Sequence, residues 1–276
     1  MTEQTRSFEV TDSFLHNERS LDEQRLFDIA AEVTSTYNLA MQQNFVPVLG
    51  FVRITNNSHT SSARAKLAIS ANPEFFEPVE FEIPEIVAGK TFELKEPQLK
   101  VSAEYLLRLK ERITTTLIIK ATFADSTAVH ESNVILLAFN ECDGYMCLPE
   151  LISAFIQPNS PTVELILANA AATLKKWGQS SAISGYQSKD PGVACNIAGA
   201  IFAAISSCQI NYCVPPASFE SGGQKIRFPE VILDNKLGTC LDLTLFFCAC
   251  LEQAGLNSLV ILTRNHAFAG LWLKDE

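Results

Sequence analysis

The stretch from Gly238 to Leu273 constrains the fold of this chain more than any other. Residues 241 to 251 are apolar nearly all round, and a surface helix does not tolerate such a run, so this segment predicts a helix inside a domain. Thr239 is a good N-cap, and Asp242 places a negative charge in the first turn, where the helix dipole favours it. Gly255 ends the predicted helix as a C-cap glycine.

Two residues of this stretch together predict a catalytic pair. Cys240 lies at the N-terminus of the helix, where the dipole stabilises a thiolate, and His266 follows a predicted buried strand at 258–263 and the turn residues Arg264 and Asn265. A cysteine nucleophile needs an imidazole within hydrogen-bond reach and on a rigid platform. Each residue alone is more often structural, so it is the pairing on helix, strand and turn that favours catalysis.

These residues also carry a resemblance. The order G-T-C-L-D-L, hydrophobic helix, A-G-L, hydrophobic strand and H-A-F-x-G-x-W resembles the core of transglutaminase-like cysteine proteases of the papain-like superfamily. From about Pro149 on, and including PPASFESGGQKIRFP at 215–229, the chain is similar to the transglutaminase-like region at the N-terminus of large bacterial superfamily 1 helicase-like proteins, the DUF4011 family. The resemblance implies Cys240 as nucleophile, His266 as general base and Gln224 as an oxyanion-hole donor.

The same resemblance implies partners. These are a protein or peptide substrate, and a helicase or nuclease region in the same chain or in a partner chain, acting in antiphage or anti-plasmid defence. In transglutaminase-like folds an aspartate on the strand after the histidine orients the imidazole. The sequence ends ten residues after His266, so that acid is either Asp275 or a residue beyond 276. The resemblance favours the second, and the chain is then expected to be the N-terminal fragment of a longer protein.

The expected chemistry is acyl transfer. His266 takes the proton of Cys240, and the thiolate attacks an acyl carbon to give a thioester. Water then completes a peptidase or amidase reaction, and an amine completes a transglutaminase reaction; both stay open. Three aromatic residues are candidates for the substrate cleft, namely Tyr212, Phe219 and Trp272. The alternative hypothesis is a non-catalytic interaction or sensing module that keeps a papain-like fold and buries Cys240.

Composition limits the partners further. The chain has 276 residues and is 47% hydrophobic, which suffices for two cores. A net charge of −10 without a basic run argues against nucleic-acid binding by this chain. MTEQTRSFEVTDSF lacks the apolar region of a signal peptide, and no run reaches the roughly 18 apolar residues of a membrane span. We therefore expect a cytoplasmic protein that does not contact the membrane.

The eight cysteines are expected to be reduced thiols. The spacings Cys142-x4-Cys147 and Cys208-x4-Cys213 differ from the C-x2-C pairs of zinc sites, so neither a metal nor a cofactor is predicted. Four cysteines are expected to be core residues of apolar helices: Cys195, Cys208, Cys248 and Cys250.

The chain as a whole predicts an α+β fold. Residues 1–38 are expected to be a polar lead-in, 39–142 an immunoglobulin-like β-sandwich and 143–276 the transglutaminase-like domain. Within the lead-in, residues 21–33 are either a short helix or, from Phe27 on, the approach to a strand; periodicity does not separate the two. The sandwich is inferred from apolar segments about ten residues apart, separated by Asn, Pro and Gly, with a helix-like insert at 103–112. Its histidines, His59 and His130, are expected to be solvated. In the second domain, helices are predicted at 148–155, 161–177 and 193–207.

Overall fold

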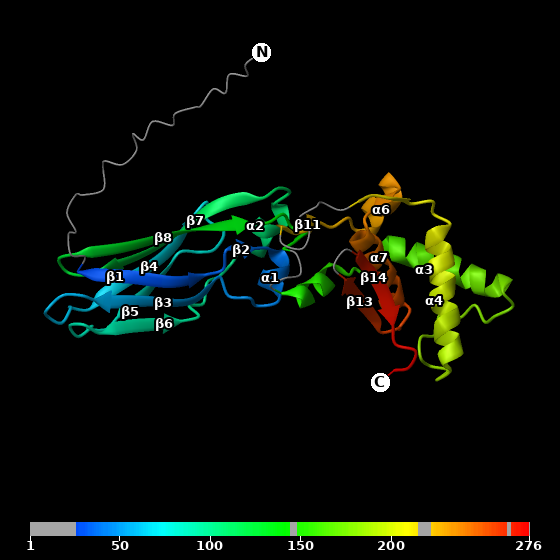
Figure 1. Cartoon of the computed structure of the whole chain (residues 1–276), viewed down its shortest axis with the longest axis horizontal. Coiled ribbons are helices and arrows are strands. Elements are labelled where there is room, and N and C mark those ends of the chain that lie inside the picture. The colour runs from blue at the N-terminus through cyan, green and yellow to red at the C-terminus, as the bar shows by residue number, and fades with distance from the viewer. Residues whose placement is uncertain (1–25, 144–147, 215–221, 264–265, 276) are drawn as a thin grey trace, which may run out of the picture.

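A computed structural model describes residues 26–143, 148–214, 222–263 and 266–275. It has an α+β fold, as the sequence predicts. Figure 1 shows two parts lying end to end: a β part (residues 26–143) and a helical part (residues 148–275).

The larger sheet of the β part has five strands. In spatial order these are β2 (Thr36–Tyr37), β8 (Thr127–Leu136), β7 (Ile113–Thr122), β4 (Ala65–Asn72) and β5 (Val79–Ile83). All neighbours are antiparallel except β2 and β8, which are parallel. Strands β4, β5, β7 and β8 fall in the apolar segments from which the sequence predicts strands, whereas β2 lies within the expected lead-in.

The smaller sheet has three antiparallel strands. In order these are β1 (Phe27–Val33), β3 (Leu49–Asn56) and β6 (Thr91–Lys95). The position of β1 corrects the expectation that residues 1–38 form a polar lead-in and that the β domain begins at 39. Apolar residues alternate with other residues from Phe27 to Val33, and this period of two places one face of β1 against the core.

One core fills the space between the two sheets. Its fully buried side chains include Leu49 and Ile54 of β3, Leu67 of β4 and Leu117 of β7. Two short helices close the end of this part that faces the helical part: α1 (Leu39–Gln43), capped by Asn38, and α2 (Ala103–Arg108), capped by Ser102. The sequence predicted a longer insert at 103–112, but the helix ends at Arg108.

The helical part is organised around α7 (Cys240–Gln253). The other elements are η1 (Pro149–Phe155, a 3₁₀ helix), α3 (Pro161–Lys176), α4 (Pro191–Ser206), α6 (Pro229–Asn235), and the antiparallel hairpin of β13 (Ser258–Thr263) and β14 (His266–Leu271). One side of α7 packs on α3 and α4, and the other on η1 and the hairpin. The prediction of a buried helix is confirmed.

Three details of the helical part differ from expectation. Cys195 is exposed and Cys208 is half-buried, because the Ala-rich helix α4 is apolar on several sides and only one side meets α3 and α7. Strand β13 is half-buried along its length rather than buried. By contrast, Cys248 and Cys250 are fully buried, as predicted.

Several bonds join the two parts. The short strand β9 (Glu141–Cys142) pairs with β11 (Gln224–Lys225), and the Asn140 side chain donates to the carbonyl of Ile226 at 2.7 Å. The ion pair Lys225–Glu111 and a hydrogen bond from the Arg112 guanidinium to the Gly222 carbonyl cross the same junction. A shared apolar core lies beneath them, with Ala40 and Cys142 from the β part and Ile152 and Ile226 from the helical part.

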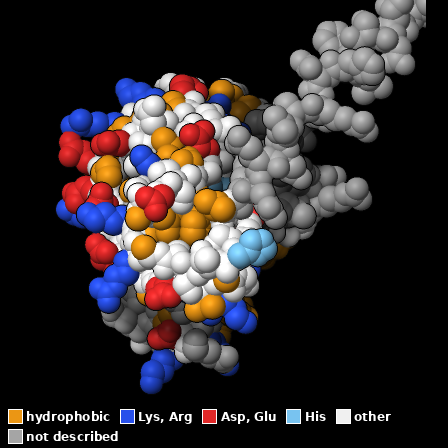
Figure 2. All heavy atoms as spheres, turned by 90° about the vertical axis from the view of Figure 1, so that its left-hand side faces the viewer, with side chains coloured by type: hydrophobic (Ala, Val, Ile, Leu, Met, Phe, Trp, Pro, Cys, Tyr) orange, Lys and Arg blue, Asp and Glu red, His pale blue; other side chains and the backbone are white. Residues whose placement is uncertain are grey.

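Acidic and basic side chains are mixed on the far end of the β part. Figure 2, which views this end, shows them next to one another around a small group of hydrophobic side chains, so the net negative charge is not gathered on this face. Exposed ion pairs of the β part such as Lys66–Glu80 and Lys100–Glu77 contribute little to stability. In the part of the chain that the structure describes, none of the helices has the length and apolar character needed to cross a bilayer.

Tyr37 generates a prediction about stability at high pH. Burial raises the pKa of its phenol from 10.0 to about 12, and its hydroxyl donates to the carbonyl of Val46 at 2.9 Å. Because the pKa is raised on folding, the stabilisation is full below pH 10 and is lost as pH rises towards 12. We expect the free energy of unfolding to fall by about 2 to 3 kcal/mol across this window. Urea unfolding at several pH values measures it.

The Tyr37→Phe variant is the matched comparison. It should be less stable near neutral pH, because a hydrogen bond is lost, and it should lack most of the alkaline decrease. Tyr105→Phe, a change at a half-buried tyrosine of α2, should keep the decrease. An equal alkaline decrease in wild type and Tyr37→Phe would contradict the assignment.

Candidate active site

The N-terminus of α7 is fixed by a capping box. Thr239 accepts the N–H of Asp242 on its hydroxyl at 3.2 Å, and Asp242 accepts the N–H of Thr239 on Oδ2 at 2.9 Å. Both predicted roles, Thr239 as N-cap and Asp242 in the first turn, are confirmed. Two of the amides that a helix start leaves without partners are thereby satisfied. Cys240, the first residue of the helix, is held in place between them.

The Asp242 carboxylate has a second partner, Arg227, which the sequence analysis missed. Asp242 is fully buried, and its oxygens accept the backbone N–H of Arg227 at 2.9 Å and the Arg227 guanidinium at 3.0 Å. A buried carboxylate without a cation would be costly, and Arg227 compensates its charge. The available signal was a single arginine between the apolar residues Ile226 and Phe228, just upstream of a helix with an acid in its first turn.

Cys240 and His266 line the same pocket, which has a volume of about 530 Å³. Cys240 is 6% exposed, whereas His266 is exposed at the start of β14. Within the described residues, the His266 ring makes no hydrogen bond, so the Cys240 sulfur and the imidazole share the pocket without being bonded to each other. The turn residues Arg264 and Asn265 lie outside the described residues.

Tyr212 completes this group of polar side chains. It lies on β10 (Asn211–Tyr212), whose parallel pairing with β12 (Leu237–Gly238) places Tyr212 opposite Gly238, close to the start of α7. Desolvation raises the pKa of the Tyr212 phenol, and so do the charge of Cys240 and a hydrogen bond to it. Tyr212 and Cys240 thus lie near one another on the wall of the same pocket. The sequence predicted Tyr212 in the cleft but not this proximity.

The remaining wall of the pocket is mainly apolar and aromatic. Among the described residues that line it, none is Asp, Glu, Lys or Arg. Phe202 of α4 and Phe247 of α7 meet edge to face with ring centroids 6.4 Å apart, and Phe268 of β14 is 44% exposed. The lining residues other than Cys240, His266 and Tyr212 are Phe202, Ile205, Ser206, Gln209, Ile210, Leu243, Thr244, Phe247, Ala267, Phe268 and Ala269. Helix α4 contributes much of this wall, and the sequence analysis did not assign it to the site.

Gln224 lies next to the site but not on the pocket. The residue is buried, with only 4% of its surface exposed. Its Nε2 donates to the Thr239 hydroxyl at 3.1 Å. Its Oε1 is buried without a hydrogen-bond partner. Exchanging the two amide atoms would keep the bond to Thr239 and leave Nε2 unpartnered instead, so either orientation carries the cost of one unsatisfied polar atom. An oxyanion role for Gln224 stays a prediction.

The structure separates Trp272 and Asp275 from this pocket. The backbone N–H of Trp272 donates to the carbonyl of Asn257 at 3.1 Å, and Asp275 accepts from the Asn257 side chain at 3.4 Å. Both contacts are at the opposite end of the hairpin from His266, about 16 Å away along β14. Trp272 is therefore not part of the cleft, and Asp275 does not orient His266. Phe219 lies outside the described residues.

Metal ligation has no support among the described residues, where no group of three or more His, Cys, Asp or Glu side chains could hold an ion. Cys195, Cys208, Cys213, Cys240, Cys248 and Cys250 are free thiols. Burial raises the pKa of Cys248 to about 11 and that of Cys250 to about 12, so both stay protonated near neutral pH.

Comparisons with known proteins identify no relative. No family model matches the chain, and no curated protein does. Among solved structures, the periplasmic chaperone SfaE has a TM-score of 0.27 at 16% identity and covers 40% of this chain, which spans 58% of SfaE. A protein from Arabidopsis thaliana has a TM-score of 0.27 at 14% identity, covering 47% of this chain and 91% of its own. TM-scores this low do not establish a shared fold.

The capping box generates a prediction. Asp242→Asn removes the charge that Arg227 compensates and one of the accepted hydrogen bonds, so we expect the free energy of unfolding to fall by about 2 to 4 kcal/mol. Chemical denaturation measures it. Asp234→Asn, on the exposed face of α6, is the matched control and should change stability by less than about 0.5 kcal/mol. Equal losses in the two variants would show that the buried carboxylate is not important for the fold.

Proposed function

We propose that this chain is a thiol-dependent acyl-transfer enzyme in which Cys240 is the nucleophile and His266 the general base. The observation that carries the proposal is that both side chains line one open pocket at the N-terminus of a buried helix. A helix N-terminus favours a thiolate, and the open pocket gives an acyl group access to the sulfur.

The proposed reaction proceeds in two halves. His266 takes the thiol proton as the Cys240 sulfur attacks the acyl carbon. The bond from that carbon to the leaving amine then breaks, and the imidazolium gives its proton to the amine. Water, deprotonated by His266, attacks the thioester and releases the acid and the free thiol. An amine in place of water would give transamidation, and hydrolysis is the preferred assignment.

The oxyanion of the tetrahedral intermediate needs hydrogen-bond donors. The backbone N–H of Cys240, at the first position of α7, is one candidate. The Tyr212 hydroxyl is a second, because Tyr212 lies near the sulfur to which the acyl carbon would be bonded. Gln224 would serve only after releasing Thr239, so we rank Tyr212 above it.

The walls of the pocket favour a particular acyl donor. Phe202, Phe247 and Phe268 are apolar, and the lining residues that the structure describes include no Lys, Arg, Asp or Glu. Such a wall suits an apolar or aromatic side chain next to the scissile bond, because burying apolar surface on both partners is favourable and a charged side chain would find no counter-ion. A protein or peptide substrate with this side chain is the proposed class.

The proposal extends to the fold. Helix α7 followed by β13 and β14, with the cysteine at the helix start and the histidine at the start of the second strand, is the order that a transglutaminase-like core requires. The two sheets of the β part, packed face to face around one core, support an immunoglobulin-like sandwich. The relationship to the region found beside bacterial helicases rests on the sequence resemblance.

A second candidate is a non-catalytic interaction module. The observation that favours it is that Cys240 is 6% exposed and lies near Tyr212, while the His266 ring is not bonded to it. In that case the sulfur would serve only in packing.

One labelling experiment separates the two candidates. The full chain in a Cys195→Ala background, which removes an exposed thiol, is treated with a peptidyl vinyl sulfone that carries phenylalanine on the acyl side. Intact mass and peptide mapping should locate the adduct on Cys240. His266→Ala should slow the reaction at Cys240 by about 10³-fold, as expected for loss of a general base.

Two controls complete the design. Cys240→Ala should abolish the adduct, and His130→Ala, a change of a histidine in the β part, should leave the rate unchanged. Equal rates at Cys240 in the parent and His266→Ala proteins, or labelling confined to other cysteines, would reject the enzyme and favour the interaction module.

A further inference from the structure

The outer edge of β13 has unpaired backbone groups. The Trp272 N–H donates to the Asn257 carbonyl, one position beyond the β13–β14 ladder and in register with it. Hydrogen-bonded and non-bonded residue pairs alternate along an antiparallel ladder, so this bond shows which pairs of β13 and β14 are the hydrogen-bonded ones. Leu259 and Ile261 therefore bond to β14, and the backbone groups of Val260 and Leu262 point to the other edge. Among the described residues, nothing accepts or donates to them there.

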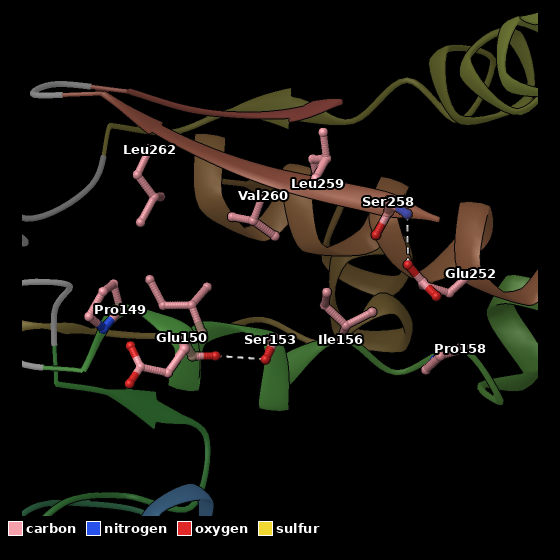
Figure 3. A pocket seen from close by; sticks show the side chains of 11 residues that line it. Pro149, Glu150, Ser153, Ile156, Pro158, Glu252, Ser258, Leu259, Val260 and Leu262 are labelled. Carbon is pink, nitrogen blue, oxygen red and sulfur yellow. Dashed lines mark hydrogen bonds between the residues drawn. The ribbon is translucent and has the colours of Figure 1, made fainter. Parts of the chain in front are cut away.

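A groove runs along this edge. It has a volume of about 700 Å³ and lies between β13 and η1. Figure 3 shows the side chains of Val260 and Leu262 directed from β13 towards η1, with Ile156 opposite them. The floor of the groove is therefore apolar, while its upper side offers main-chain N–H and C=O groups. That combination fits an extended peptide, which needs both.

The edge is not protected in the usual ways. Strands at sheet edges commonly carry a proline, an inward lysine or a bulge that prevents pairing. Strand β13 reads SLVILT, and its register with β14 is continuous from Ser258 to Thr263. One backbone group on this edge has a hydrogen-bond partner: the Ser258 N–H donates to the Glu252 carboxylate at 2.8 Å (Figure 3). Beyond Ser258, none of the described residues bonds to this edge.

Two carboxylates mark the ends of the groove. Glu252 lies beside Ser258, and Glu150 lies on η1 towards the other end of β13 (Figure 3). The lining residues within the described ranges include no Lys or Arg. The charge pattern therefore favours a ligand with basic residues. It disfavours a second copy of this chain, because pairing two β13 edges would bring like charges together.

We propose that β13 binds an extended segment of a partner protein by strand addition. The segment has apolar side chains at alternate positions, directed at the floor of the groove, and Lys or Arg at its ends, near Glu150 and Glu252. The groove shares no lining residue with the pocket of Cys240. This binding is independent of the proposed enzyme activity.

The test uses the full chain and a fluorescein-labelled, end-blocked peptide, Lys-Val-Thr-Val-Thr-Val-Lys, with binding followed by fluorescence anisotropy. Ser153 is exposed on η1 and lines the groove, so Ser153→Trp should fill it and weaken binding by about tenfold or more. Ala154→Trp, the next residue and exposed away from the groove, is the matched control and should bind as wild type does.

Charge and backbone are tested separately. Glu150→Gln should weaken binding about threefold, and added salt should reduce that difference. The same peptide N-methylated at alternate residues keeps its side chains but loses the donors on one edge, so it should not bind. Cys240→Ala should bind the peptide unchanged, which separates this proposal from the enzyme.

Three results would overturn the proposal. These are equal binding of the N-methylated peptide, equal binding by Ser153→Trp and Ala154→Trp, and a dimer in sedimentation that Ser153→Trp alone dissociates, which would assign the edge to a second copy.

Discussion

The site depends on the hydrogen bonds that the buried carboxylate of Asp242 accepts. It caps α7 through Thr239 and also holds the backbone and side chain of Arg227, so the segment before α6 and the start of α7 are fixed to one another. A fully desolvated charge is tolerable only with several donors directed at it, and here three N–H groups meet it. Cys240 directly follows this capped start, and its side chain also packs in the apolar core that contains Leu241 and Ala267.

Much of the helical part was predictable because its signals are local. A cap, an apolar run and a glycine define α7, and each acts within one turn of the helix. The strands of the β part were predictable for a similar reason, since alternation with a period of two survives without knowledge of the partners. In β1 the same alternation was present, but the charged residues on either side obscured it.

The failures concern contacts between distant segments. Trp272 follows His266 closely in sequence, yet a hairpin strand carries it to the far end, where it meets Asn257. Cys195 lies on a helix whose apolar residues surround it, so periodicity could not tell which side would be covered. Gln224 and Tyr212 reach the start of α7 from opposite directions by short two-residue pairings, and such short strands leave little trace in a sequence. Sequence reasoning identified these residues but not their neighbours.

The position of Gln224 on β11 connects the β part to the start of α7. In the described chain, the ladder partner of β11 is β9 of the β part, and the amide of Gln224 touches the hydroxyl that caps α7. Gln224 therefore connects the edge of the β part to a residue next to Cys240. A displacement of β9 relative to the helical part would move Gln224 and, with it, the hydroxyl that caps α7.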